Sequence, residues 1–203
     1  MIVYCATGNP GKLHEFRLAA RQSGIQVETL PGLAAIPPCE ETGATFEANA
    51  ILKAEYYGQY APGPLFADDS GLEVDALGGV PGVYSARFAG PGATDADNNG
   101  LLLERMRGVA NRAARFVCVI ALVDSGRLRH TFRGAVEGAI LDEPRGPNGF
   151  GYDPLFYYPP FGCSFGEVAP ERKLTVSHRG AALRALFRHL ATGAFDRIKK
   201  ART

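Results

Sequence analysis

The sequence of 203 residues lacks an excess of charge of either sign. Lysine and arginine together number 22 and aspartate and glutamate 21, which gives a formal net charge of +1. Proteins that bind nucleic acids or anionic membrane surfaces usually carry a large basic excess. We therefore expect no nucleic-acid partner and no membrane partner, and we interpret the short basic segment at residues 197–202 as a solvated chain end.

A long apolar run and a secretory signal are also missing. No stretch approaches the length of a membrane span. The apolar residues 1–5 follow no basic segment, and Gly8-Asn9-Pro10-Gly11 ends the run early. We therefore expect a cytoplasmic protein.

Cysteine and histidine are too few and too scattered to indicate a transition-metal site. The four cysteines show no C-x-x-C pattern, and the four histidines show no H-x-x-x-H spacing. Cys5 and Cys118 lie inside apolar, strand-like runs, so we expect both in the core. Any metal should be a hard ion held by carboxylates.

The order of apolar and polar residues predicts an α/β protein. Strand–helix units and a hairpin both occur, so we expect a mixed β-sheet. The run at 115–123 is apolar and rich in β-branched residues, which favours the centre of the sheet. Expected strands cover residues 2–6, 25–30, 64–71, 72–76, 115–123, 128–134 and 136–141, and expected helices cover 12–23, 45–57, 94–107 and the residues after Ser177.

A glycine-containing turn, residues 7–12, joins the first expected strand to the first expected helix. Such turns often bind phosphate, because backbone N–H groups and the positive helix end point at the anion. This turn is not a P-loop, since Ala6 and Leu13 stand where that motif needs Gly and Ser or Thr. The residues alone leave two interpretations open, another kind of anion loop or a plain turn.

Two pairs of adjacent acids are candidate metal ligands. Asp68 and Asp69 are expected at the end of the strand at 64–71 and precede Ser70-Gly71. Adjacent carboxylates repel each other, and a cation would relieve that repulsion; a polar turn is the alternative. Glu40 and Glu41 form the second pair, for which the alternative is a loop that faces water.

Two further segments could recognise a ligand. Residues 149–154 read Gly-Phe-Gly-Tyr-Asp-Pro, and the two rings either stack on a base or fill the core. Ser177-His178-Arg179 opens a helix whose N–H groups and arginine could meet an anion or a carbonyl oxygen. The alternative for this segment is a serine cap followed by surface charges.

Considered together, these segments suit a nucleoside triphosphate that carries Mg²⁺. Carboxylates would hold the ion, cationic side chains the phosphates, and aromatic rings the base. The cations are Lys12, Lys53, Lys173 and Arg179. This interpretation requires that residues far apart in the sequence converge in space.

The chain resembles the inosine/xanthosine triphosphate pyrophosphatases, enzymes that remove noncanonical purine nucleotides. The matching pieces occur in the family's order and span nearly the whole chain. They are Thr7-Gly8-Asn9 with Lys12, Glu40-Glu41-Thr42-Gly43, Glu47 with Asn49-Ala50 and Lys53-Ala54, residues 67–72, residues 77–87, residues 149–154, Lys173 and Ser177-His178-Arg179. Residues 161–167 depart from the family, which more often has Thr-Phe-Ala-Glu there.

The resemblance implies an elongated α/β fold with a mixed β-sheet flanked by helices. It implies a single domain over residues 1–203, with two lobes and a deep central cleft. It also implies a homodimer and Mg²⁺-dependent hydrolysis of ITP, dITP, XTP or dXTP to the monophosphate and pyrophosphate. Two alternatives remain, a non-catalytic purine nucleotide sensor and a pyrophosphatase with another nucleotide specificity.

The resemblance also assigns roles to individual residues. Asp69 would be the catalytic acid–base residue and a metal ligand, and Ser70 would touch the substrate. Glu40 or Glu41 would be the other metal ligand, with Glu41 favoured by its spacing, and Asp68 would hold a second ion or tune Asp69. Triphosphate ligands would be Thr7, Gly8, Asn9, Pro10, Gly11, Lys12 and Lys53; base and sugar ligands would be Phe150, Gly151, Tyr152, Asp153, Lys173, His178 and Arg179.

Overall fold

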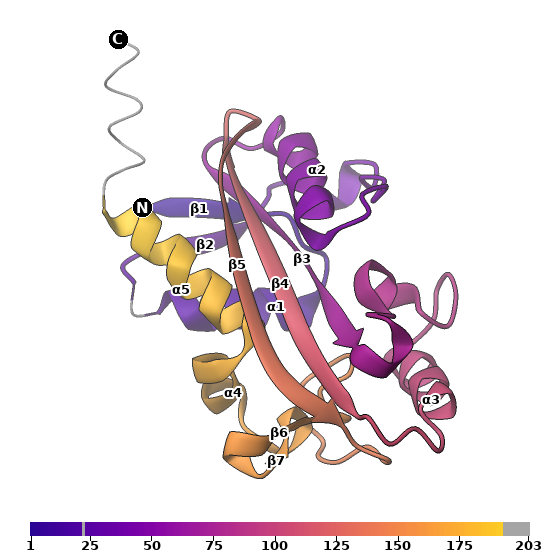
Figure 1. Ribbon diagram of the computed structural model, residues 1–203. Helices are drawn as coiled ribbons and strands as arrows, with labels where there is room; N and C mark the ends of the chain where they lie inside the picture. The colour runs from indigo at the N-terminus through magenta and orange to yellow at the C-terminus, as the bar shows by residue number, and fades with distance from the viewer. Residues whose placement is uncertain (22, 193–203) are drawn as a thin grey trace.

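Seven strands form one mixed sheet at the centre of the computed structural model, which describes residues 1–21 and 23–192 (Figure 1). The basic segment 197–202 lies outside the described residues. The spatial order of the strands is β2-β1-β3-β4-β5-β6-β7. The strands are β1 (Ile2–Cys5), β2 (Gln26–Thr29), β3 (Leu65–Val74), β4 (Ala113–Asp124), β5 (Arg127–Ile140), β6 (Phe156–Tyr158) and β7 (Cys163–Ser164).

The strand pairing confirms the mixed sheet. β1 pairs in parallel with β2 and β3, and every other neighbouring pair is antiparallel. The register of β1 with β3 covers only Leu65 and Phe66. Beyond Phe66, the side of β3 that faces away from β4 is therefore a free edge of the sheet, up to Leu72, whose N–H donates to Ser85 Oγ over 2.9 Å, and the bridge between Glu73 and Pro81.

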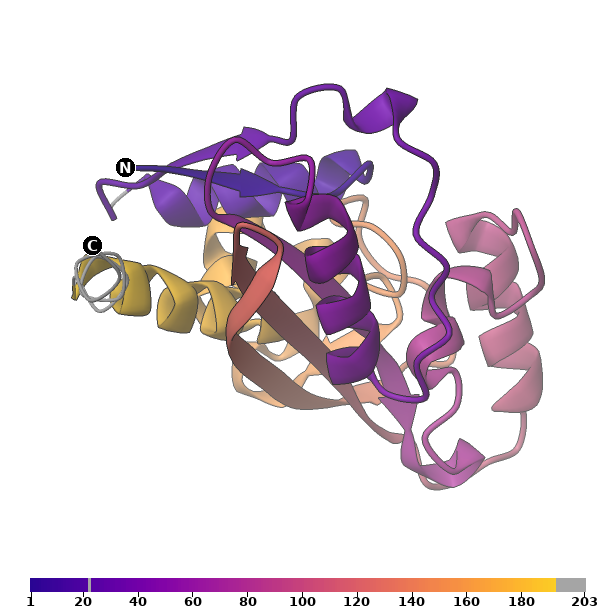
Figure 2. The same ribbon diagram turned by 90° about the horizontal axis from the view of Figure 1, so that it is seen from above.

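Helices cover both faces of the long strands, as the two views show (Figures 1 and 2). α2 packs against β3 and β4, while α5 packs against β4 and β5 and contacts α1 and α4. The helices are α1 (Pro10–Ala20), α2 (Phe46–Gly58), α3 (Asp95–Arg105), α4 (Pro170–Val176) and α5 (His178–Ala191). None of the helices in the described part of the chain is long and apolar enough to cross a membrane.

Alternate residues of β4 enter different cores. Cys118 and Ile120 pack under α1 and α5, whereas Val117 and Val119 pack under α2, because side chains alternate between the faces of a strand. A strand buried on both faces reads as a continuous apolar run, which is why its central position was predictable. Cys118 and Cys5 are fully buried, as expected.

Side-chain caps fix where the site-bearing helices begin. Thr45, Thr94 and Ser177 each accept a hydrogen bond from a backbone N–H in the first turn of α2, α3 and α5. Asn9 does the same for α1, which starts at Pro10 and so two residues earlier than expected. The helix α4 was not predicted, because it is only seven residues long and ends directly before Ser177, the cap of α5.

The structure corrects the prediction for residues 64–76. We expected one strand to end at Asp68 and Asp69 and another to begin at Leu72, but β3 runs unbroken from Leu65 to Val74. Each of its residues pairs with β4, so the ladder supplies the backbone partners that a turn would otherwise need. The predicted strands at 128–134 and 136–141 are likewise one strand, β5, which forms the expected hairpin with β4.

Phe66 is a test of how much the core between β3 and α1 stabilises the fold. Its ring is fully buried and meets the ring of Phe16 edge to face at 5.0 Å. Phe66→Ala should lower the free energy of unfolding by about 3–5 kcal/mol, measured by urea denaturation. Leu128→Ala, at a side chain that is 38% exposed, should cost less than about 1 kcal/mol; equal losses would contradict this packing.

Candidate active site

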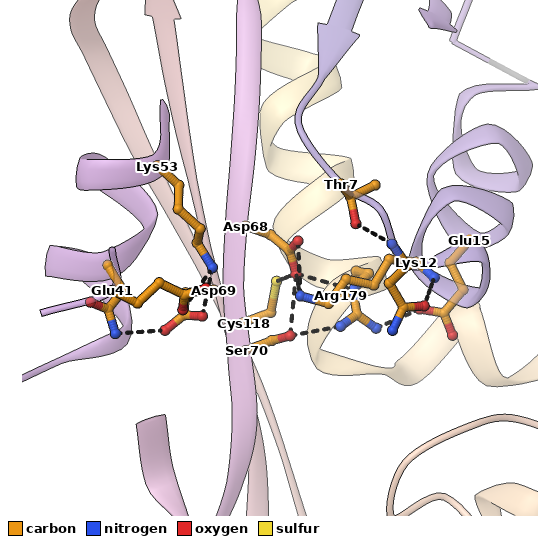
Figure 3. Close-up of polar contacts among 12 residues, drawn as sticks. Thr7, Lys12, Glu15, Glu41, Lys53, Asp68, Asp69, Ser70, Cys118 and Arg179 are labelled. Atoms are coloured by element: carbon orange, nitrogen blue, oxygen red, sulfur yellow. Dashed lines mark hydrogen bonds and ion pairs between the residues drawn. The ribbon is translucent and has the colours of Figure 1, made fainter. Parts of the chain in front are cut away.

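The middle of β3 directs its two aspartates to opposite faces of the sheet. Figure 3 shows Asp69 on the side of Lys53 and Glu41, and Asp68 on the side of Lys12 and Arg179. Both carboxylates are buried, with exposed fractions of 6% for Asp69 and 4% for Asp68. The two acids therefore do not form one site, although they are neighbours in the sequence.

On the α2 side, Asp69 belongs to a cluster built by one face of the helix. Lys53 Nζ lies 2.8 Å from Asp69 Oδ1 and 3.2 Å from Glu41 Oε2. Asn49, one turn earlier, donates to Asp69 Oδ2 over 3.3 Å and accepts the N–H of Gly43 over 2.7 Å. Burial raises the pKa of Asp69, and the charge of Lys53 opposes this shift.

On the other face, Asp68 is held by two cations and a hydroxyl. Lys12 Nζ lies 3.0 Å from Asp68 Oδ2, Arg179 Nε lies 3.5 Å from the same oxygen, and Ser70 Oγ donates to it over 3.2 Å. Burial alone would raise the pKa of Asp68. The charges of Lys12 and Arg179 outweigh burial and hold the pKa well below its usual range.

Glu15 connects the cations of the C-terminal helices, and the sequence analysis missed it. Its Oε1 lies 2.8 Å from Lys173 Nζ, and its Oε2 lies 2.6 Å from Arg179 Nη1. Lys173 also pairs with Asp153. The signal was available in the helical spacing, since Glu15 is three residues after Lys12 and so lies on the same face of α1.

His178 lies at the start of α5, buried against an aromatic ring. It is 3% exposed and stacks on Phe116 with 4.7 Å between ring centroids. Burial lowers the pKa of His178 well below its usual value, and the charges of Arg179, Lys173 and Lys12 add to the effect. The imidazole is therefore neutral at physiological pH.

Both clusters reach one pocket at the free edge of β3. Because β1 pairs no further than Phe66, side chains from both faces can turn around this edge. Asp69 and Lys12 thus line the same pocket, as the nucleotide interpretation requires. The predicted site residues in its wall are Asn9, Lys12, Glu41, Lys53, Asp69, Ser70, Phe150, Gly151, Tyr152, Asp153, Lys173, His178 and Arg179.

Six predicted residues lie outside this wall: Thr7, Gly8, Pro10, Gly11, Glu40 and Asp68. Glu40 is exposed, so the structure favours Glu41 of the pair. Asp68 points to the opposite face from Asp69 because adjacent residues of a strand alternate. In the opening turn, the N–H groups of Asn9 and Lys12 are bonded to Thr7 Oγ1 and Asn9 Oδ1, so neither is available as an anion donor.

The segment at 161–167, which departs from the pattern of the family that the sequence resembles, keeps a local cap. Ser164 and Glu167 form a reciprocal capping box around a short 3₁₀ turn. Gly166 N–H then donates to the carbonyl of Asp153 over 3.0 Å. The departure therefore leaves the backbone of Asp153 bonded to Gly166, and Asp153 in turn pairs with Lys173.

Other residues of the wall were not singled out from the sequence. Arg87 differs from the other cations of the pocket, because within the described residues it has no carboxylate at ion-pair distance. Its Cζ instead lies over the ring of Tyr84, 5.3 Å from the ring centroid. Its segment, residues 77–87, was part of the family resemblance without an assigned role. The unassigned wall residues are Gly71, Val83, Ser85, Ala86, Arg87, Asp95, Asn98 and Phe116.

The acids of the pocket fit a hard divalent cation. The described residues contain no group of three or more side chains arranged as metal ligands. Glu41 and Asp69 nevertheless converge on one positive centre, since both lie within 3.2 Å of Lys53 Nζ. Mg²⁺ is commonly bound by one or two carboxylates together with substrate phosphates, so two acids suffice.

A model of the Ham1 family matches residues 3–189. The chain belongs to the Ham1 family. A dITP/XTP pyrophosphatase from Acidobacterium capsulatum is 50% identical over 199 residues, which covers 94% of this chain and 98% of the relative. One of the same name from Thermus thermophilus is 52% identical over 188 residues, covering 92% of this chain and 90% of the relative.

Solved Ham1 structures share the fold. A HAM1 protein from Coxiella burnetii superposes with a TM-score of 0.84 at 40% identity, covering 95% of this chain and 99% of that one. This likeness confirms the mixed sheet with flanking helices. The family membership confirms the resemblance on which the residue roles were based.

The ion pairs of Asp68 in this Ham1 chain predict a pH dependence of stability. Because Lys12 and Arg179 hold the folded pKa below the unfolded value of about 3.9, these pairs stabilise fully above that pH. Their contribution is lost as the pH falls through the folded pKa. The free energy of unfolding should therefore fall more steeply below about pH 4 in the wild type than in Asp68→Asn.

Urea denaturation over a series of pH values measures these slopes. Asp142→Asn is the control, because the Asp142 side chain is 94% exposed, so that its ion pair with Arg112 at 3.2 Å is screened by solvent and should leave the wild-type slope nearly unchanged. Parallel profiles for the wild type and Asp68→Asn would show that the pairs do not stabilise the fold.

Proposed function

We propose that this protein hydrolyses noncanonical purine nucleoside triphosphates, ITP, dITP, XTP and dXTP, to the monophosphate and pyrophosphate. One observation carries the proposal. A single pocket is lined by the cations Lys12 and Lys53, by the acids Glu41 and Asp69, and by residues 150–153 of the aromatic loop (residues 149–154) together with Arg179. The names of the relatives, dITP/XTP pyrophosphatase, support the same activity.

Among the acids of the pocket, Asp69 is the residue that orients the attacking water and accepts its proton. Asn49 and Lys53 each hold one of its oxygens, so the carboxylate has a fixed orientation. Burial raises its pKa, which makes it a better proton acceptor than an exposed aspartate. Water aligned by Asp69 would attack the α-phosphorus in line with the pyrophosphate leaving group, and Asp69 would take its proton.

A Mg²⁺ ion is part of the proposal. Glu41 and Asp69 would hold it, and it would offset phosphate charge and lower the pKa of nearby water. Glu40 and Asp68 are not proposed as ligands, because neither lies in the wall of the pocket.

The cations neutralise the polyphosphate. Lys12 and Lys53 reach the pocket from α1 and α2, one on each side of β3. Both are paired with buried carboxylates, so their net attraction for an anion is reduced. Arg87 carries no such partner among the described residues, which makes it the strongest additional candidate for a phosphate ligand.

Hydrogen-bond donors in the wall of the pocket would select a 6-oxo purine. Neutral His178 can donate through Nε2, and Arg179 always donates. Adenine presents a 6-amino donor there and would be mismatched, a difference worth roughly 10⁴ or more in selectivity. Guanine also carries a 6-oxo group, so its rejection requires a part of the pocket wall that leaves its 2-amino group in a clash or without a hydrogen-bond partner. We assign this to the loop of Phe150, Gly151, Tyr152 and Asp153.

The same proposal includes a single two-lobed domain and a homodimer, which rest on the family resemblance, and a cytoplasmic location, which rests on the composition of the sequence. Activity assays distinguish the proposed function from its two alternatives. A nucleotide sensor would bind dITP without releasing pyrophosphate, and a pyrophosphatase of other specificity would prefer another triphosphate in a substrate panel.

Asp69→Asn tests the catalytic assignment. The amide cannot accept the proton from water, so kcat for dITP with Mg²⁺ should fall roughly 10²–10⁴-fold, measured by pyrophosphate release. Asp142→Asn, at an exposed acid, should retain wild-type activity. An Asp69→Asn enzyme within threefold of the wild type, or a wild type that binds dITP without hydrolysing it, would refute the proposal.

Arg87→Ala tests the phosphate assignment. Loss of an unpaired guanidinium should raise the KM for dITP roughly tenfold and weaken inhibition by pyrophosphate, while inhibition by IMP stays nearly constant. Arg127→Ala, an exposed arginine in the β4–β5 hairpin, is the control. An equal loss of IMP and pyrophosphate binding would place Arg87 with the base instead.

A further inference from the structure

Helix α3 holds one residue of the aromatic loop from both sides. Asp95 Oδ2 accepts the N–H of Gly151 over 2.6 Å, and Asn99 Nδ2 donates to the carbonyl of Gly151 over 3.0 Å. Asp95 and Asn99 are four residues apart, so they lie on one face of the helix. We call this pair of hydrogen bonds the α3–Gly151 contact.

The same turns of α3 also hold a second segment that contributes to the pocket wall, residues 85–89. Asn98 accepts the N–H of Ala89 over 2.9 Å and donates to the carbonyl of Ala86 over 3.3 Å. Tyr152, next to Gly151, donates from its hydroxyl to the carbonyl of Ser85 over 2.8 Å. The aromatic loop and residues 85–89 are thus fixed relative to each other through the first half of α3.

The side-chain amide of Asn99 has one favoured orientation in the α3–Gly151 contact. Its Oδ1 is buried and has no hydrogen-bond partner in the described part of the chain. An unsatisfied buried acceptor is unfavourable, yet a reversed amide would set its oxygen against the carbonyl oxygen of Gly151. The amide is therefore oriented by the need for a donor at Gly151.

Asp95 is an unexpected residue in a pocket for a polyanion. It lines the same pocket as Lys12 and Arg179, and a carboxylate there repels the phosphates of a substrate. Its bond to Gly151 N–H supplies a structural reason for its presence. Gly151 has φ +60°, a conformation that a non-glycine residue would adopt only with strain.

The position of Gly151 bears on where the ring of its neighbour Phe150 lies, together with the hydrogen bond from Phe150 N–H to Asp153 Oδ2 over 2.9 Å. That ring is 4.9 Å from Lys173 Nζ and 5.5 Å from Arg179 Cζ, measured to its centroid. It also packs on Gly11, where an added Cβ would come within 2.6 Å of a ring atom. A shift of the loop would move the ring away from the cations that are proposed to face the base.

We propose that Asp95 and Asn99 are positioning residues for base recognition, which act by holding Gly151 and hence the Phe150 and Tyr152 walls of the pocket. This inference rests on the proposed function and deepens it, because it names residues that set selection among purines. Neither side chain needs to touch the base. The effect should therefore appear in KM and in selectivity, and not in the chemical step.

Steady-state kinetics with dITP and dGTP test the proposal on Asp95→Ala, Asp95→Asn and Asn99→Ala. Each alanine variant should raise the KM for dITP roughly five- to tenfold, keep kcat within about twofold, and narrow the preference for dITP over dGTP. Asp95→Asn should stay close to the wild type, because its amide oxygen still accepts the N–H of Gly151. Glu104→Gln, exposed on the same helix, is the matched control.

The double variant Asp95→Ala/Asn99→Ala adds a test of coupling. Both side chains hold the same residue, so its effect on KM should be smaller than the product of the single effects. If Asp95→Asn behaves like Asp95→Ala, the charge of Asp95 matters and not its bond to Gly151, and the proposal is overturned. A fall in kcat at constant KM would also overturn it, since that result indicates a lower fraction of folded enzyme.

Amide hydrogen exchange separates this inference from the proposed function. The Gly151 amide should exchange faster in Asp95→Ala than in the wild type and remain protected in Asp95→Asn, whatever the substrate is. If the wild type fails to hydrolyse dITP while this pattern holds, the proposed function is wrong and the α3–Gly151 contact stands. Equal Gly151 protection in the wild type and Asp95→Ala would refute the contact itself.

Discussion

The alternation of side chains along β3 is the constraint from which the rest of the site follows. Asp68 and Asp69 would repel each other on one face of the sheet, but a pleated strand sends them to opposite faces. Each acid then receives its own lysine, Lys53 from α2 and Lys12 from α1. Because Lys53 lies on α2, Lys12 on α1 and Arg179 on α5, the packing of these helices on the two faces of the sheet also determines which cations meet each aspartate.

The buried charges of Lys173, Arg179 and Glu15 matter more for the orientation of the cations than for the stability of the fold. Lys173 and Arg179 are each 3% exposed and share Glu15, whose pKa would be raised by burial but is lowered by their charges. Buried ion pairs of this kind repay their desolvation only when the geometry is good, so they add little net stability. What they provide is a fixed guanidinium and a fixed ammonium before any ligand arrives, which lowers the cost of ordering them on binding.

The sequence predicted the elements whose signals are local. The central strand, the hairpin and the starts of the helices near Thr45, near Thr94 and after Ser177 follow from apolar runs and short motifs, and the structure confirms them. The division of Asp68 from Asp69 was missed, because the unbroken β3 depends on pairing with β4, forty or more residues away. Glu15, Asp95 and Asn99 were missed for a related reason, since their partners are brought to them by tertiary packing. The family resemblance named most of the pocket without explaining how it is assembled.

The short register between β1 and β3 has a consequence for the behaviour of the protein in a crowded solution. Between Phe66 and Leu72, whose N–H already donates to Ser85 Oγ, the ladder of β3 has an unpaired side, and such sides can recruit a strand from another molecule and start aggregation. Charged groups pointing inward at an open edge are a known protection against this, because an incoming strand would have to strip their water. Lys12 and Lys53 line the pocket at this opening, so a strand pairing there would first have to displace water from the same two side chains that suit a polyphosphate.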